Sequence, residues 1–328
     1  MQSKLRLSPA KKIMALAVAI AASAAFVYLI HPGLLKPRAA VATTHLVAPA
    51  EFDADVELKR LAAANAETLA REFSRFSYTW PPAHTGAVPP IEVIRLPENL
   101  DGLVVHAKKS IFFRTLLPIV IVENKRLEAT RGWMIEQFEK GRIAEGSAEW
   151  TRLGAIARRY RVKGDVNDEA TRARLLRRVD TIPVALALAQ AAVESGWGTS
   201  RFALQGNSLF GEWTFSRNRG AGLRPEDRDE GARHSVRAFP DIRASVRSYM
   251  HTLNAGFAYG KLRLMRERMR SEGGPLDAMG LAAGLVRYSQ RGESYVMEIR
   301  RMIKANGLDR LVGKDLAFNT APAGPPEA

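Results

Sequence analysis

Residues 187–203, ALAQAAVESGWGTSRFA, place a single carboxylate at the end of an apolar segment. From Pro183 onward only Gln190 interrupts the apolar residues that precede Glu194. A helix that is apolar on every side is buried in the middle of its domain. Proline is tolerated in the first turn of a helix, so Pro183 marks the start of this one. The pattern therefore predicts a buried helix in a mainly α-helical domain.

Glu194 falls in the last turn of the predicted helix, where unpaired backbone carbonyls create a negative potential. That potential and the loss of water both disfavour the charged carboxylate, so we expect a raised pKa for Glu194. A carboxyl group that stays protonated near neutral pH can act as the general acid of glycoside cleavage. The structural alternative is a helix-end glutamate that caps a neighbouring loop or pairs with an arginine.

The residues after the helix combine a flexible backbone with aromatic rings. Glycines in the Gly-Trp-Gly stretch 196–198 allow a sharp turn and a close approach to a ligand, and Trp197 offers a flat apolar face. The stretch GNSLFGEWTF (206–215) ends in a strand-like pattern with Trp213 and Phe215 on one face. Because sugars have apolar C–H faces, these rings are candidate polysaccharide contacts. The alternative is the core of a small lobe.

The segment QAAVESGWGTSRFALQGNSLFGEWTF (190–215) resembles the glucosaminidase family, glycoside hydrolase family 73, and within it the Bax-type membrane-anchored members. The resemblance continues through FPDIRASVRSYMHTLN, FAYGKLR and GLVRYSQRGESYVMEIRRMI, and upstream through FFRTLLPIVIVEN. It implies a lysozyme-like α-helical lobe with a small β-hairpin lobe. The implied activity is cleavage of the bond after N-acetylglucosamine in peptidoglycan, with no cofactor and no metal.

Carried over position by position, the resemblance makes Glu194 the catalytic acid and Tyr249 a tyrosine near the reacting sugar. Within the sequence, Tyr249 shares a helical face with Ile242, Val246 and Met250, so a tyrosine at the edge of the core is the alternative. The substrate-binding residues that we predict from the aromatic pattern and the family matches are Trp197, Asn207, Phe210, Trp213, Tyr288 and Tyr295.

The resemblance places a second catalytic acid on the hairpin, within LRPEDRDEGARHSVRAF (223–239). Glu230 is the first choice, because a glycine follows it and HSVRAF alternates like a returning strand. Glu226, Asp227 and Asp229 are the alternatives. This carboxylate would activate water; otherwise the 2-acetamido group of the sugar would act as the internal nucleophile.

The N-terminus carries a membrane-targeting pattern. Lysines and arginines within residues 1–12 precede IMALAVAIAASAAFVYLI (13–30), an uncharged run of about 18 residues that can span a bilayer. The small residues at 22–24 resemble a signal-peptide cleavage site, but the apolar run continues beyond them. We predict a single-pass inner-membrane anchor with the basic end in the cytoplasm and the catalytic domain in the periplasm.

The remaining chain divides by composition and helical periodicity. The apolar run IFFRTLLPIVIV (111–122) is too short to span a membrane and holds Pro118, so we interpret it as a core helix. Further helical patterns cover 123–140, 147–161 and 168–179. The predicted organisation is a tether and a juxtamembrane helix (from Phe52 to Phe76) within 31–95, a helical part at 96–179, the glucosaminidase domain at 180–312 and a disordered tail at 313–328.

The net charge of +15 favours polyanionic partners, either nucleic acid, anionic lipid or a cell-wall polymer, unless the basic residues are only a solvated surface. The basic amphipathic helix predicted at 261–270 is open to the same interpretations. The absence of cysteine excludes disulfides, thiolate metal sites and thiol nucleophiles. The export signal and the lack of a binding motif argue against nucleic acid.

These observations together predict a peptidoglycan hydrolase that acts on glycan strands and is held in the inner membrane. A lytic transglycosylase on the same scaffold and a non-catalytic wall-binding or regulatory protein are the two alternatives.

Overall fold

The computed structural model describes residues 58–82, 88–214, 222–225 and 234–316, and its longest element is the 35-residue helix α3 (Val105–Glu139). The predicted core helix at 111–122 and the helical pattern at 123–140 are thus one continuous helix. Pro118 lies inside α3, where it removes one backbone hydrogen bond. Because the turns around Pro118 are buried, packing on every side holds the helix together.

The segment before α3 forms a small parallel sheet and a short helix. Strand β1 (Lys59–Leu61) pairs in parallel with β2 (Ile91–Val93), and α2 (Ala66–Arg75) and the 3-10 turn η3 (Glu98–Leu100) pack nearby. Of the helix predicted from Phe52 to Phe76, the described part is helical over Ala66–Arg75, whereas Lys59–Leu61 form strand β1. Asn65 starts α2 late, because its side chain accepts a hydrogen bond from the Thr68 N–H at 2.9 Å.

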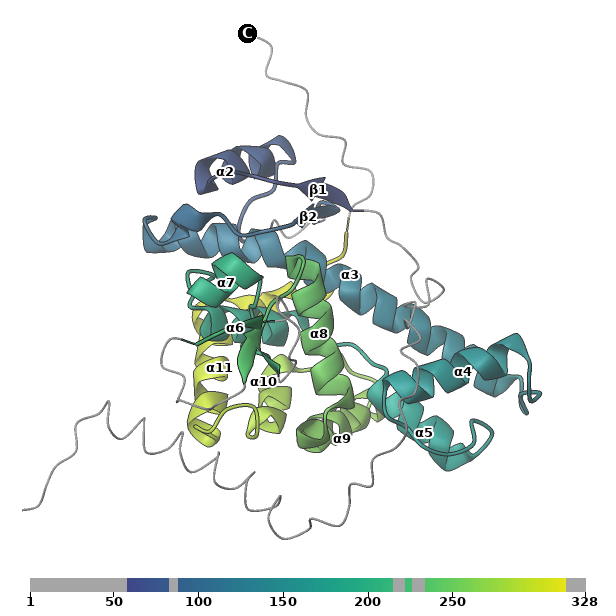
Figure 1. The fold of residues 1–328 in the computed structure, drawn as a ribbon. Helices are drawn as coiled ribbons and strands as arrows, with labels where there is room; N and C mark the ends of the chain where they lie inside the picture. The colour runs from purple at the N-terminus through teal and green to yellow at the C-terminus, as the bar shows by residue number, and fades with distance from the viewer. Residues whose placement is uncertain (1–57, 83–87, 215–221, 226–233, 317–328) are drawn as a thin grey trace, which may run out of the picture. The chain divides into compact units, whose positions relative to one another are not determined.

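Two helices follow at the far end of α3, as Figure 1 shows. They are α4 (Ala148–Arg159) and α5 (Glu169–Arg178), and they confirm the helical patterns predicted at 147–161 and 168–179. Ser147 caps α4 by accepting the Trp150 N–H. The helical periodicity located both helices, whereas Asp168 before α5 makes no side-chain cap hydrogen bond.

Helix α6 (Val184–Ser195) is the buried helix predicted from the apolar run. All residues from Ala185 to Ala192 are buried, and the helix packs against α3 and α11 (Glu293–Ala305). Pro183 stands immediately before the first helical residue, as the N-cap and not within the first turn. Since α6 is covered on all sides, its C-terminal end is held firmly in place.

The rest of the described chain surrounds α6 with short helices and one small sheet. The sheet is antiparallel with strand order β3-β5-β4, and β5 contains the returning strand predicted from HSVRAF. The described chain is therefore mainly helical with small sheets, consistent with a lysozyme-like lobe. The elements are α7 (Arg201–Gly206), β3 (Trp213–Thr214), β4 (Gly222–Leu223), β5 (Ser235–Arg237), α8 (Ile242–Ala255), η4 (Phe257–Tyr259), α9 (Gly260–Ser271), α10 (Ala278–Leu281), η5 (Ala282–Leu285) and η6 (Leu308–Leu311).

Helix α9 is the basic helix predicted at 261–270, but part of its charge points inward. Arg266 has a fully buried side chain, and its Nη1 donates to the Thr181 carbonyl at 2.9 Å. Arg263 is also buried and donates to the Leu253 carbonyl at 2.9 Å. Those two arginines therefore bind backbone carbonyls of the fold and are not part of a solvated face.

A buried carboxylate links α8 to α3 through ion pairs. The Glu123 side chain of α3 has no exposed surface and accepts hydrogen bonds from Arg243 at 2.8 Å and Arg247 at 2.9 Å, both on α8. Arg126 adds a third contact at 3.1 Å. Burial raises the pKa of Glu123, but the hydrogen bonds from Arg247 and Arg243 and the charges of Arg126 and Arg247 outweigh it and leave the pKa lowered.

The C-terminal end of the described chain meets Val88, which lies between β1 and β2 in the sequence. Val88 forms a parallel bridge with Leu316, and its N–H donates to the Asp315 carbonyl at 3.0 Å. The Asp315 carboxylate also binds Lys125 of α3 at 2.8 Å. The C-terminal residues thereby contact both the segment that precedes β2 and helix α3.

Among the residues that the structure describes, no helix has both the length and the apolar character needed to cross a bilayer. The predicted anchor at 13–30 lies outside these residues.

Candidate active site

The C-terminal end of α6 turns away sharply just after Glu194. Gly196, Trp197 and Gly198 all have positive φ, at 59°, 63° and 79°. A Cβ on Gly198 would come within 2.5 Å of the Leu96 side chain, so only glycine fits there. The turn predicted from the glycines is confirmed, and the close neighbour at Gly198 is the protein itself.

The Trp197 side chain packs against α3. Its ring meets Phe112 and Phe113 edge-on at centroid distances of 5.9 and 5.3 Å, and the Lys109 ammonium lies 4.6 Å from the ring centroid. The ring is half-buried. These contacts anchor the turn after Glu194, whereas a sugar contact by Trp197 stays a prediction.

Glu194 is half-buried, and its pKa is raised, as the sequence predicted. Burial is the largest cause, and the nearby negative charge of Glu298 adds to it. A hydrogen bond from Tyr295 and the positive charge of Arg291 act in the opposite direction. The carboxyl group is thus biased toward its protonated form but retains a donor that stabilises the charged form.

A chain of hydrogen bonds leads from the core to Glu194. Tyr249 on α8 donates its hydroxyl to Gln190 Oε1 at 2.8 Å, and Gln190 Nε2 donates to the Tyr295 hydroxyl at 2.9 Å. Tyr295 in turn donates to Glu194. Gln190 is fully buried one helical turn before Glu194. The sequence analysis noted this single polar residue but gave it no role, although residues four apart on a helix share a face.

The predicted aromatic residues lie together behind Glu194. Phe210 stacks on Tyr249 at 3.9 Å, and Tyr288 stacks on Tyr295 at 5.5 Å. The Tyr288 hydroxyl also donates to the Phe210 carbonyl at 3.0 Å. Phe210, Tyr249 and Tyr295 are buried, so they position their neighbours from within the core.

Two other predicted substrate contacts differ in their surroundings. Asn207 is buried at the C-cap of α7 with φ of 49°, and its Nδ2 donates to the Phe239 carbonyl at 3.1 Å. Trp213 is 57% exposed and lies beside His234 at 4.2 Å. Trp213 therefore presents an open face on the small sheet, while Asn207 supports a turn.

The predicted second acid, Glu230, falls in the connection between β4 and β5, outside the described residues. Glu226, Asp227, Asp229 and Phe215 are outside them as well.

The structure adds one carboxylate that the sequence analysis did not single out. Glu212 follows Gly211, and a Cβ on Gly211 would lie 3.6 Å from Glu194 Oε2. The Glu212 pKa is raised, mainly by burial, although hydrogen bonds from Ser248 and Thr252 and the charge of Arg237 lower it. The only sequence signal was a carboxylate between Phe-Gly and an aromatic strand.

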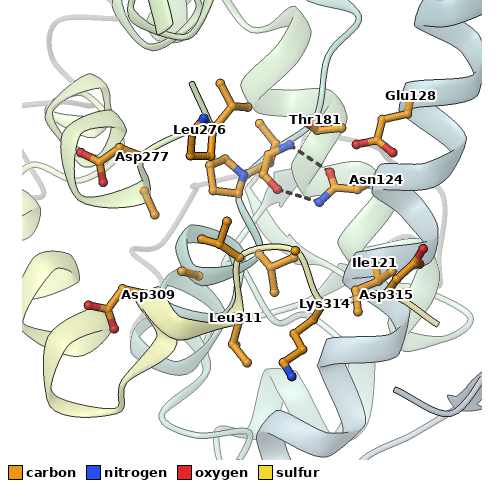
Figure 2. A pocket seen from close by; sticks show the side chains of 18 of the residues that line it. Ile121, Asn124, Glu128, Thr181, Leu276, Asp277, Asp309, Leu311, Lys314 and Asp315 are labelled. Carbon is orange, nitrogen blue, oxygen red and sulfur yellow. Dashed lines mark hydrogen bonds between the residues drawn. The ribbon is translucent and has the colours of Figure 1, made fainter. Parts of the chain in front are cut away.

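The best-formed cavity lies at the opposite end of α6. Figure 2 shows this cavity of about 540 Å³, where Asn124 bonds to the backbone of Ile182. Lys125 and Arg270 face it, but they pair with Asp315 and Asp180 at 2.8 Å each. The length of α6 separates it from Glu194 by roughly 15 Å. We therefore place the candidate active site at Glu194.

In the described residues, no group of three or more His, Asp or Glu side chains is placed to hold a metal ion.

Comparison with known proteins relates the segment that holds this site to a family. Residues 170–308 match the Glucosaminidase model, described as mannosyl-glycoprotein endo-beta-N-acetylglucosaminidase, so this segment is similar to the glucosaminidase family. It is similar to Protein bax of Escherichia coli (strain K12), with 33% identity over 192 residues. That alignment covers 57% of this chain and 66% of the relative, just under two thirds of its length. No solved structure matches the chain.

Proposed function

We propose that this chain is a peptidoglycan hydrolase that cleaves the glycosidic bond after N-acetylglucosamine, with Glu194 as the general acid. The observation that carries the proposal is a half-buried carboxyl group with a raised pKa at the end of α6, inside the segment that matches the family. Similarity to the family supports glycosidase chemistry on peptidoglycan. The choice of bond and of acid is our inference.

Protonated Glu194 gives its proton to the departing glycosidic oxygen as the bond to the anomeric carbon breaks. Burial raises the pKa of Glu194 and so favours its protonated form before the reaction. The Tyr295 hydroxyl then donates to the carboxylate that remains and so stabilises the product state. Water completes the hydrolysis, activated by a second carboxylate or replaced in the first step by the sugar's 2-acetamido group.

Product analysis tests which bond is cut. Digestion of purified peptidoglycan should give new reducing ends that carry N-acetylglucosamine, which borohydride converts to the alditol. The carboxylates of 226–230 suit hydrolysis, since a transglycosylase closes its product internally and needs no activated water. Reduced muramic acid or anhydro-muramic ends as the main product would assign another activity, and intact glycan would indicate a binding protein.

Glycan strands lie outside the cytoplasm, so the proposal requires export. We propose that residues 13–30 anchor the chain in the inner membrane with the catalytic domain in the periplasm. A reporter fused after residue 320 should be active only outside the cytoplasm, and the full-length mass should persist in membranes. A mature N-terminus near Ala25, or a reporter active in the cytoplasm, would contradict the anchor.

Tyr295→Phe tests the hydrogen bond to Glu194. That bond lowers the Glu194 pKa, so its removal should raise the pKa further. Because the acid must be protonated, activity disappears as pH rises through this pKa, and the high-pH limb of kcat/KM should move to higher pH. Tyr288→Phe is the control, since its hydroxyl binds the Phe210 carbonyl. An unchanged limb in Tyr295→Phe would show that the bond does not tune the acid.

A further inference from the structure

Glu212 lies near the general acid Glu194, because it directly follows Gly211, whose backbone faces the Glu194 carboxyl group. A Cβ atom at Gly211 would lie 3.6 Å from Glu194 Oε2, so the side of Gly211 that carries no side chain faces that oxygen. Since adjacent Cα atoms are 3.8 Å apart, the Glu212 Cα lies within about 9 Å of that oxygen. Gly211 itself has φ of 62°, so the chain bends here and enters β3 directly after Glu212.

One oxygen of Glu212 has hydrogen-bond partners among the described residues, and the other has none. Oε2 accepts the Ser248 hydroxyl at 2.8 Å and the Thr252 hydroxyl at 3.4 Å, two residues on one face of α8. The Arg237 guanidinium lies 3.9 Å from the same oxygen. Oε1 is buried and has no hydrogen-bond partner among the described residues, and the side chain is 14% exposed.

The charges of Glu194 and Glu212 both raise the pKa of the same residue, Tyr259. Burial raises the pKa of Tyr259 to about 12, and the negative charges of Glu212 and Glu194 both contribute. The Tyr259 ring is half-buried and lies against Tyr288 at 5.9 Å. Two partly buried carboxyl groups therefore lie near the same tyrosine.

We propose that Glu212 is the second carboxylate of the reaction and that its Oε1 accepts a proton from the water that attacks the anomeric carbon. This inference rests on the proposed function. A buried carboxylate oxygen requires a donor, and a water molecule supplies one that also has a proton to give. Ser248 and Thr252 hold the carboxylate so that Oε1 keeps its direction. Burial also raises the Glu212 pKa, which makes its charged form a stronger base.

Glu212 and Glu194 together account for every proton that moves in the reaction. The water oxygen bonds to the anomeric carbon while one water proton passes to Glu212, and the glycosidic C–O bond breaks with its electron pair on the leaving oxygen. Glu194 supplies the proton to that oxygen. Glu212 ends protonated and Glu194 ionised, and exchange with solvent restores both.

Alanine substitution with azide tests this role. In the full chain in detergent, Glu212→Ala should lower peptidoglycan cleavage by about 10²–10⁴-fold. Azide should restore part of the rate and give a glycosyl azide detectable by mass, because azide attacks without losing a proton. Glu272→Ala, an exposed carboxylate, is the control. Glu230→Ala runs in parallel, because Glu230 is the second acid that the sequence predicts and therefore the competing assignment.

Glu212→Gln separates a base from a structural partner. Its amide oxygen can still accept from Ser248, so a purely structural Glu212 would leave activity and melting temperature near wild type. A base would lose activity with folding unchanged, and the low-pH limb of kcat/KM would disappear.

Three results would overturn the role of Glu212 while the wild type stays active and dependent on Glu194. They are retained activity in Glu212→Ala, a folded and inactive Glu212→Ala that yields no glycosyl azide, or a glycosyl azide from Glu230→Ala alone. A wild type that releases no reducing ends would instead overturn the proposed function, and the role of Glu212 with it.

Discussion

Glu194→Gln is expected to lower peptidoglycan cleavage by about 10²–10⁴-fold with folding unchanged. Glutamine keeps the size of the side chain and can still accept the Tyr295 hydroxyl, but it has no acid proton to give. The measurement is the rate of release of reducing ends by wild type and variant at equal concentration.

Glu293→Gln is the matched control, because this exposed glutamate begins α11 away from the hydrogen-bond chain. It should leave the rate unchanged. Turnover near the wild-type value in Glu194→Gln would mean that another residue supplies the proton, and the assignment of the site would have to move.

Glu123→Ala is expected to give the largest loss of stability, about 3–5 kcal/mol in the free energy of unfolding. The substitution removes the ion pairs that the buried Glu123 makes with Arg243 and Arg247 between α3 and α8. Urea unfolding at neutral pH measures the loss. Glu136→Ala, which removes an exposed pair with Lys140 on the same helix, should cost at most about 1 kcal/mol.

The pH dependence of the same experiment has a definite sign. Because the folded-state pKa of Glu123 is lowered, its contribution is fully present above the unfolded-state value of about 4.3 and is lost as pH falls through the folded-state pKa. The difference between wild type and Glu123→Ala should therefore shrink in acid. A difference that is small at neutral pH, or that grows as pH falls, would contradict the role of the buried network.

Sequence reasoning succeeded where local pattern and packing agree. Helix α6 and its terminal Glu194 followed from an unbroken apolar run, and the turn followed from its two glycines. The strand at Ser235–Arg237 followed from alternation in HSVRAF. In each case the residues that decide the structure are neighbours in the chain.

Prediction from the sequence failed where contacts between distant segments determine the structure. The sequence predicted separate helical segments at 111–122 and 123–140, but they form the single continuous helix α3, which is buried around Pro118. The burial of Arg266 depends on backbone carbonyls near Thr181, and the surroundings of Trp197 depend on two phenylalanines of α3. The hydrogen bonds to the Glu212 carboxylate come from hydroxyl groups on α8. No periodicity within these segments contains that information.

The bridge between Val88 and Leu316 has a consequence for how the chain folds. Synthesis proceeds from the N-terminus, so Val88 and Lys125 must wait for almost the whole described chain before their partners at 315–316 exist. Contacts between such distant segments slow folding, because the intervening loop must close first. Until Asp315 reaches Lys125, apolar surface of the early segments is open to aggregation and proteolysis. The newly made chain should therefore depend on chaperone protection until its final residues have been made.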